Sequence, residues 1–249
     1  DLTAVGDLLR GKVVLVTGGG GSIGSEIVDQ VAGFEPAAVW AFDRDETLLH
    51  EGKLRWPEEV HVVLGDVRDA DATLRTFERI RPDVVFHAAA LKHVPVLEDN
   101  AEEAVLTNVI GTANVIQAGS RTGMERFVLD DGWFGGRRDD RRGLGDWVVS
   151  ADVYPHGLAP LIDHVVGLGM EFGIWVEPEM VSPDSDLYRA HPDWALVDHR
   201  YEPVLFRDQL VLNLAHPDAY AEIFARLDAL LRDHRISYLK WDMNRDHVQ

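Results

Sequence analysis

The sequence predicts an α/β protein with parallel strands, in which two halves share one sheet. Apolar runs of strand length, such as residues 12–17 and 38–43, alternate with helical patterns along the 249 residues. Glycine or charged residues follow most of these runs. The run at 126–129 stands in the middle of the chain, and the residues that follow the strands differ in type before and after it. We expect eight strands in the order 3-2-1-4-5-6-7-8, in which right-handed crossovers place the later strands outward in turn and the second half curls. A closed eight-stranded barrel is the alternative.

Composition and charge restrict the possible partners and compartments. The chain has no cysteine, which excludes disulfides and thiolate metal sites, and we predict no bound metal. The net charge of −19 argues against nucleic acid and anionic membranes. No apolar run is long enough for a transmembrane helix, and the first residues lack the layout of a signal peptide. The absence of cysteine fits a reducing cytoplasm, so we expect a cytoplasmic protein or a recombinant product. The missing initiating Met indicates a cut or processed chain.

A glycine-rich turn follows the first strand. Gly18, Gly21 and Gly24 have the spacing G-x-x-G-x-x-G and open a helix, and Asp43 ends the next strand. Such glycines let the backbone approach a pyrophosphate at the helix N-terminus, while a strand-end acid binds ribose hydroxyls. A merely flexible turn would not explain Asp43. The pattern predicts a dinucleotide site.

The next strand-like runs extend this pattern. Residues 61–67 end in Asp66 and Val67, as an adenine-contacting edge would. Residues 84–90 end in alanines that leave room for a cofactor, and a helical stretch at 101–118 contains Asn108.

Four motifs resemble the extended short-chain dehydrogenase/reductase family. They are Thr17–Gly24, Asp66–Asp69, His87–Pro95 and Thr107–Asn114, and they are most similar to the CapD-like nucleotide-sugar 4,6-dehydratases and epimerases of polysaccharide biosynthesis. The resemblance covers residues 11–128. It implies a Rossmann-like fold and an NAD cofactor held by Gly18, Gly21, Ser22, Ile23, Gly24, Asp43, Asp66, Val67, Ala88, Lys92 and Asn108. The chain has no Tyr-x-x-x-Lys, so this reaction lacks its catalytic pair.

The strands of the second half end in charged groups. Asp130 and Asp131 follow one strand, residues 177 and 179 are glutamates after another, and Lys240 and Asp242 end the last. Since alternate strand residues share a face, Tyr238, Lys240, Asp242 and Asn244 would line one side. Several polar strand tips together are typical of barrel active sites. The charged cluster Arg137–Arg142 is predicted to be a solvated loop.

Five further motifs resemble the α-galactosidases of glycoside hydrolase family 36. They are Leu129–Gly135, Gly145–Trp147, Gly173–Met180, His191–Trp194 and Lys240–Arg245, and the resemblance covers residues 126–245. It implies a half (β/α)8 barrel in which Asp242 is the nucleophile. It also implies a galactose subsite shaped by Asp130, Asp131, Asp146, Trp147, Trp175, Arg207 and Lys240. Asp208 stands where that family more often has asparagine.

The hydrolase resemblance is incomplete as well. Only four of eight barrel strands are predicted, and the family's acid/base lies on a later strand, although a retaining glycosidase needs two carboxyl groups. We therefore predict a chimera of residues 1–124 and 125–249, joined at buried Phe127 and Val128. The first half would bind NAD(H), and neither half would have a complete catalytic set.

Two alternatives stay open. One is an active enzyme, either an α-galactosidase-like hydrolase or a nucleotide-sugar dehydratase/epimerase. The other is a structural scaffold that binds nothing. The expected partners are a dinucleotide and, in the second half, galactosides, and an open sheet edge would allow oligomers.

Overall fold

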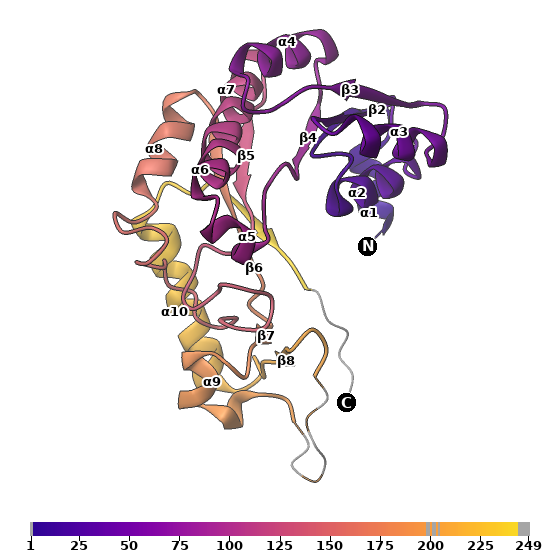
Figure 1. Cartoon of the computed structure of the whole chain (residues 1–249). Helices are drawn as coiled ribbons and strands as arrows, with labels where there is room; N and C mark the ends of the chain where they lie inside the picture. Colours follow the sequence, from indigo (N-terminus) through magenta and orange to yellow (C-terminus); the bar gives the residue numbers. More distant parts are fainter. Residues whose placement is uncertain (1, 198–199, 201–202, 204, 244–249) are drawn as a thin grey trace. The chain divides into compact units, whose positions relative to one another are not determined.

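The computed structural model describes residues 2–197, 200, 203 and 205–243 (Figure 1). The chain divides into two compact units, residues 1–124 and residues 125–249. No helix within the described ranges has the length and hydropathy needed to cross a membrane.

The first unit is a parallel sheet with helices between its strands. The sheet order is β3-β2-β1-β4, the order expected from the sequence, and Val14 of β1 pairs with Val39 of β2 and Val84 of β4. The elements are α1 (Leu2–Leu9), β1 (Val13–Thr17), α2 (Ser22–Ala32), β2 (Ala38–Asp43), α3 (Glu46–Arg55), β3 (Val60–Leu64), α4 (Ala70–Ile80), β4 (Val84–His87), α5 (Val94–Glu98), α6 (Ala101–Ala104), the π-helix η1 (Val105–Gly111) and α7 (Thr112–Thr122).

Strand β1 is apolar along its whole length because both of its faces are covered. Val14 and Val16 belong to one core cluster, with Val28 of α2. Leu15 belongs to a second cluster, with Phe77 of α4. A strand between two helix layers needs apolar residues at every position, which explains the continuous valine-rich run.

The glycines after β1 are required by close packing. A Cβ on Gly24 would lie 1.9 Å from the carbonyl oxygen of Gly18, so α2 can pack on the loop only with glycine there. Gly18 has φ +70°, and a Cβ on it would lie 2.6 Å from the backbone of Ala88 and Ala89. Both glycines are therefore explained by the fold, whatever occupies the nearby cleft.

The second unit contains a three-stranded parallel sheet, ordered β5-β6-β9, and a small antiparallel pair, β7-β8 (Figure 1). Helix α8 packs against β6, whose residues from Phe172 to Val176 are all buried. The elements are β5 (Arg126–Leu129), α8 (Ala159–Gly167), β6 (Glu171–Val176), β7 (Met180–Val181), α9 (Asp186–Ala190), the 3-10 helix η2 (Pro192–Trp194), β8 (Leu210–Val211), α10 (Pro217–Asp233) and β9 (Tyr238–Trp241).

The prediction of one eight-stranded sheet is wrong. The described strands form three sheets, because β5 pairs with β6 and not with β4. The predicted strand at 209–214 contributes only β8, which pairs antiparallel with β7 in the segment after β6. The second unit thus has three barrel-type strands where four were predicted, and no described sheet closes into a barrel.

Phe127 and Val128 are less buried than predicted. Both have intermediate exposure. Phe127 packs against Phe172 of β6, with ring centroids 5.8 Å apart, since the parallel register places these residues side by side. Their packing therefore serves the sheet of the second unit.

Candidate active site

Three charged or aromatic residues lie in one row at the carboxyl ends of the parallel strands. Trp175 of β6 pairs with Lys240 of β9, and Leu129 of β5 pairs with Ile174, so Asp130 follows in the row of Trp175. Lys240 Nζ donates to Asp130 Oδ2 at 2.9 Å. The register of the sheet thus unites two residues that are 110 positions apart.

Asp242 follows directly after β9 and is held by both of its carboxylate oxygens. Trp175 Nε1 donates to Oδ2 at 2.8 Å, and the backbone N–H of Met243 donates to Oδ1 at 2.8 Å. The backbone N–H of Asp242 donates to Val176 O at 2.9 Å, which extends the pairing of β9 with β6. These two hydrogen bonds fix the orientation of the Asp242 carboxylate. Asn244, predicted to lie on the same face, is outside the described residues.

A cluster of aromatic side chains supports the row. Trp133, Phe134, Trp147 and Trp175 are all buried, and successive rings lie 4.5–6.2 Å apart. Trp133 Nε1 donates to the carbonyl oxygen of Trp175 at 2.8 Å, so the loop after β5 is fastened to β6. Long loops with a packed core of their own are commonly functional.

Asp146 and Trp147 lie in the interior. The Asp146 carboxylate accepts from the backbone N–H groups of Asp186 and Leu187, at 2.9 and 3.0 Å, at the start of α9. Arg226 of α10 lies 3.9 Å from it. Trp147 belongs to the buried aromatic cluster. Both side chains are thus held inside the second unit, and their part in the sugar subsite, which the resemblance implied, stays a prediction.

Arg207 lies on an exposed turn between Phe206 and Gln209. Arg207 and Asp208 have φ of 54° and 55°, the left-handed region that costs most non-glycine residues energy. Aspartate and asparagine both tolerate this region better than arginine does. Asp208 can therefore adopt the same turn as the asparagine that the resembling family more often has at this position.

The two glutamates after β6 differ in exposure. Glu177 is fully buried, whereas the half-buried Glu179 accepts from Trp241 Nε1 at 3.1 Å.

Arg137 is a site residue that the sequence reasoning missed. It is buried in contact with Asp131, although the cluster Arg137–Arg142 was predicted to be a solvated loop. That prediction holds for Arg141, whose side chain is 75% exposed. The flanking glycines were the available signal: Gly143 has φ +84°, and a Cβ there would lie 2.7 Å from Arg137 N. Such a crowded turn indicates a tightly folded loop.

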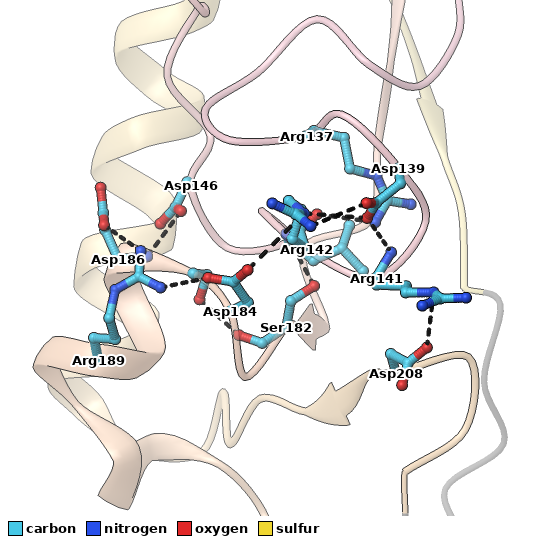
Figure 2. A network of polar contacts seen from close by, with 12 residues as sticks. Arg137, Asp139, Arg141, Arg142, Asp146, Ser182, Asp184, Asp186, Arg189 and Asp208 are labelled. Carbon is cyan, nitrogen blue, oxygen red and sulfur yellow. Dashed lines mark hydrogen bonds and ion pairs between the residues drawn. The ribbon is translucent and has the colours of Figure 1, made fainter. Parts of the chain in front are cut away.

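The exposed members of this cluster connect loops of the second unit (Figure 2). Arg142 lies 3.2 Å from Asp139 and 3.9 Å from Asp184, and Arg189 of α9 binds Asp184 at 2.7 Å. The backbone N–H of Arg141 and the charge of Arg142 hold the pKa of Asp139 below its usual value. Exposed ion pairs add little stability, so their main effect is to orient the loops.

The structure brings six of the eleven predicted cofactor residues of the first unit to one cleft of about 240 Å³. It is lined by Gly18, Gly21, Asp43, Asp66, Val67 and Ala88, among others. Ser22 and Ile23 lie exposed at the start of α2, and Lys92 Nζ is 3.5 Å from Ser22 Oγ.

Several polar groups at this cleft are already engaged within the protein. Asn108 binds the backbone N–H and carbonyl of Leu91, both at 2.8 Å, and Asp43 accepts from Gly20 N at 3.0 Å. Burial raises the pKa of Asp66, but hydrogen bonds and charge from Arg68, with the charge of Arg44, bring it below the usual value.

The surroundings of His87 predict that the stability of the first unit depends on pH. Its Nδ1 lies 2.7 Å from Thr17 Oγ1 and its Nε2 lies 2.9 Å from Thr112 Oγ1. Desolvation lowers the pKa of His87 from 6.5 to about 4, although the residue keeps an exposed edge. Between these values the unfolded chain binds more protons, so the free energy of unfolding should fall as pH drops from about 6.5 to about 4.

The His87→Gln variant should therefore lose less stability on acidification. Thermal unfolding of both proteins, measured at intervals from pH 8 to pH 4.5, checks this. Above about pH 7 the two curves should run parallel, because His87 is neutral in both states. Equal slopes below pH 6.5 would contradict the prediction.

Comparisons with known proteins associate most of the chain with one family. A family model described as Melibiase matches residues 57–249. "Alpha-galactosidase" of Escherichia coli is 58% identical over 127 residues, which are 51% of this chain and 18% of that protein. "Alpha-galactosidase AgaA" of Geobacillus stearothermophilus is 45% identical over 199 residues, which are 80% of this chain and 27% of that protein. The chain spans less than a third of the length of these relatives.

Two solved structures are similar to this chain and differ in their sequence identity and in the share of the chain that they cover. The GH36 alpha-galactosidase AgaB from Geobacillus stearothermophilus has a TM-score of 0.53 at 49% identity and covers 54% of this chain and 19% of that one. A structure titled "X-ray structure of Pen from Bacillus thuringiensis" has a TM-score of 0.51 at 28% identity and covers 68% of this chain and 50% of that one.

The predicted NAD cofactor is wrong. The matching family and relatives are glycosidases that work without a cofactor. Hydrolysis of a glycosidic bond transfers no hydride, so it gives a nicotinamide nothing to do. The glycine spacing that suggested the cofactor is accounted for by the packing of α2 on Gly18.

Proposed function

The chain belongs to the melibiase family, and from this premise we propose that its second unit carries the galactose-binding and nucleophile-bearing part of a retaining α-galactosidase site. Its relatives are named alpha-galactosidases, and a related structure is titled as a complex with raffinose. The proposed substrates are accordingly α-galactosides.

The contact between Trp175 and Asp242 carries this proposal. The indole N–H fixes the carboxylate at 2.8 Å, at the strand end where barrel enzymes place their catalytic groups. In the proposed reaction an Asp242 oxygen attacks the anomeric carbon and forms a galactosyl ester. The bond to the leaving oxygen breaks with its electron pair, and that oxygen takes a proton. Water then hydrolyses the ester. We assign the proton donor to no residue of this chain.

Asp130 and Asp131 are the proposed acceptors for sugar hydroxyls. Asp130 accepts from Lys240 Nζ and from the backbone N–H of Asp131, which together use about half of the acceptor directions of a carboxylate. Its side chain is 65% exposed, so the others reach solvent. Lys240 thus orients a sugar-binding carboxylate from the strand that also leads to Asp242.

Titration with galactose tests the proposal. We expect heat of binding with galactose and much less with glucose, its epimer at carbon 4. Lys240→Met should weaken galactose binding by about 10-fold or more, because Asp130 loses a charge-assisted hydrogen bond. Lys12→Met, an exposed position in the first unit, is the matched control. No heat with galactose at concentrations of about 100 mM, far above a weak dissociation constant, would refute the proposal.

We further infer that the first unit has a separate origin, in the extended short-chain dehydrogenase/reductase family, and serves as a structural unit. The strand order β3-β2-β1-β4 and the crowded glycine loop support this inference. The Melibiase match begins at residue 57, inside the first unit. The start of the match therefore does not coincide with the boundary between the two compact units, which lies after residue 124.

A further inference from the structure

Arg137 differs from the other arginines of its loop in being enclosed. Its side chain is 4% exposed, whereas that of Arg142 is 46% exposed. Arg137 Nε lies 3.0 and 3.1 Å from the two carboxylate oxygens of Asp131, and a terminal nitrogen lies 2.8 Å from Oδ2. The other terminal nitrogen donates to Arg142 O at 3.1 Å.

This enclosure is built into the loop. A buried cation is costly unless it is paired and hydrogen-bonded, so the fold must keep Asp131 against Arg137. Gly143, in the left-handed region, lets the chain turn back so that Arg142 O faces the guanidinium. The fork of an arginine also fixes the plane of the carboxylate that it binds, which a point charge cannot do.

The Asp131 carboxylate is enclosed on one side and open on the other. Its side chain is 38% exposed, and its neighbour Asp130 is held by Lys240. Two adjacent carboxylates repel each other, and here each has a cation supplied by a different segment. Arg137 occupies the acceptor directions on its own side, which leaves those facing solvent for hydroxyl groups.

We propose that Arg137 is a positioning residue that sets the orientation of Asp131 for sugar binding. The inference rests on the proposed function of the second unit. Without the guanidinium the carboxylate can rotate, and its hydrogen bonds to hydroxyls are made less often. Arg137→Met and Arg137→Lys should both weaken galactose binding by about 10- to 100-fold, the range for hydrogen bonds to charged groups.

A double-mutant cycle on galactose affinity tests this role. Dissociation constants are measured by calorimetry for the unsubstituted chain, Arg137→Met, Asp131→Asn and the double variant. If Arg137 acts through Asp131, the double variant should bind within about 3-fold of Asp131→Asn alone. Arg142→Met is the matched control, because this side chain contacts Asp139 and Asp184 and should leave affinity within about 2-fold.

Thermal unfolding and circular dichroism of each variant separate a loss of affinity from a loss of folding. If Arg137→Met does not fold, Arg137→Lys carries the test, since it keeps the charge and loses only the fork. Unchanged affinity in a folded Arg137→Lys protein, or losses that multiply in the double variant, would overturn the positioning role and leave the proposed function intact. A lack of galactose binding by the unsubstituted chain would overturn both.

Discussion

We expect the unsubstituted chain to form a covalent galactosyl adduct with α-galactosyl fluoride, and Asp242→Asn should abolish it. Fluoride leaves with the electron pair of the carbon–fluorine bond and needs little help from an acid, so the nucleophile alone can complete this half-reaction. The variant amide keeps an oxygen that accepts from Trp175 Nε1, but it is not a nucleophile. Intact mass spectrometry should show one galactosyl group on the unsubstituted chain and none on the variant.

The location of the adduct decides the interpretation. Peptide mapping should place it on Asp242, and Asp233→Asn, an exposed position at the end of α10, should retain it. Natural galactosides should react far more slowly than the fluoride, because their leaving oxygen needs a proton. An adduct that survives Asp242→Asn, or maps to another carboxylate, would contradict the assigned nucleophile.

Trp133→Ala should cost the second unit about 3–5 kcal/mol of unfolding free energy, the range for a large aromatic removed from a core. Trp133 is fully buried and packs against Phe134 and Trp147. Its removal also takes the indole donor from the carbonyl oxygen of Trp175, which leaves a polar group without that partner. Denaturant unfolding followed by tryptophan fluorescence and circular dichroism measures the loss.

The same variant tests whether the two units unfold separately. Because their cores are distinct, we expect the transition of the first unit to stay in place while that of the second moves to lower denaturant. Trp133→Phe, which keeps an aromatic ring but loses the donor, should show a smaller loss. A change below about 1 kcal/mol, typical of a surface site, would contradict the central role of this side chain.

Local patterns in the sequence determined much of both units. The valine-rich run of β1 predicted a strand covered on both faces. In the structure, each face of β1 belongs to a hydrophobic core cluster that includes helix residues. The order β3-β2-β1-β4 was expected from the dinucleotide-binding pattern of strands, glycines and strand-end acids. In the second unit, the sequence predicted that charged strand tips gather at one edge of a parallel sheet, and in the structure Lys240 Nζ donates to Asp130 Oδ2. These predictions succeeded because hydrophobic periodicity and the position of a strand end can be read from residues that are close together in the sequence.

Glycine spacing shows where a local pattern is ambiguous. Gly18 and Gly24 satisfy a phosphate-binding spacing, but the same two residues are required where α2 packs on its loop. The pattern reports the close approach of backbone segments, and this approach does not identify a ligand. The prediction of NAD failed for that reason.

Only the tertiary structure decided how distant segments pair. The pairing of β5 with β6 instead of β4 depends on contacts across the 41 residues between Leu129 and Glu171, including the long aromatic loop. The same holds for the burial of Arg137, whose charge resembles that of its exposed neighbours, and for Asp146, which caps α9. A side chain's role is set by the partner that the fold places next to it. Asp146 meets a backbone N–H group 40 positions away, and Arg137 meets Asp131, which lies six positions away among several other carboxylates.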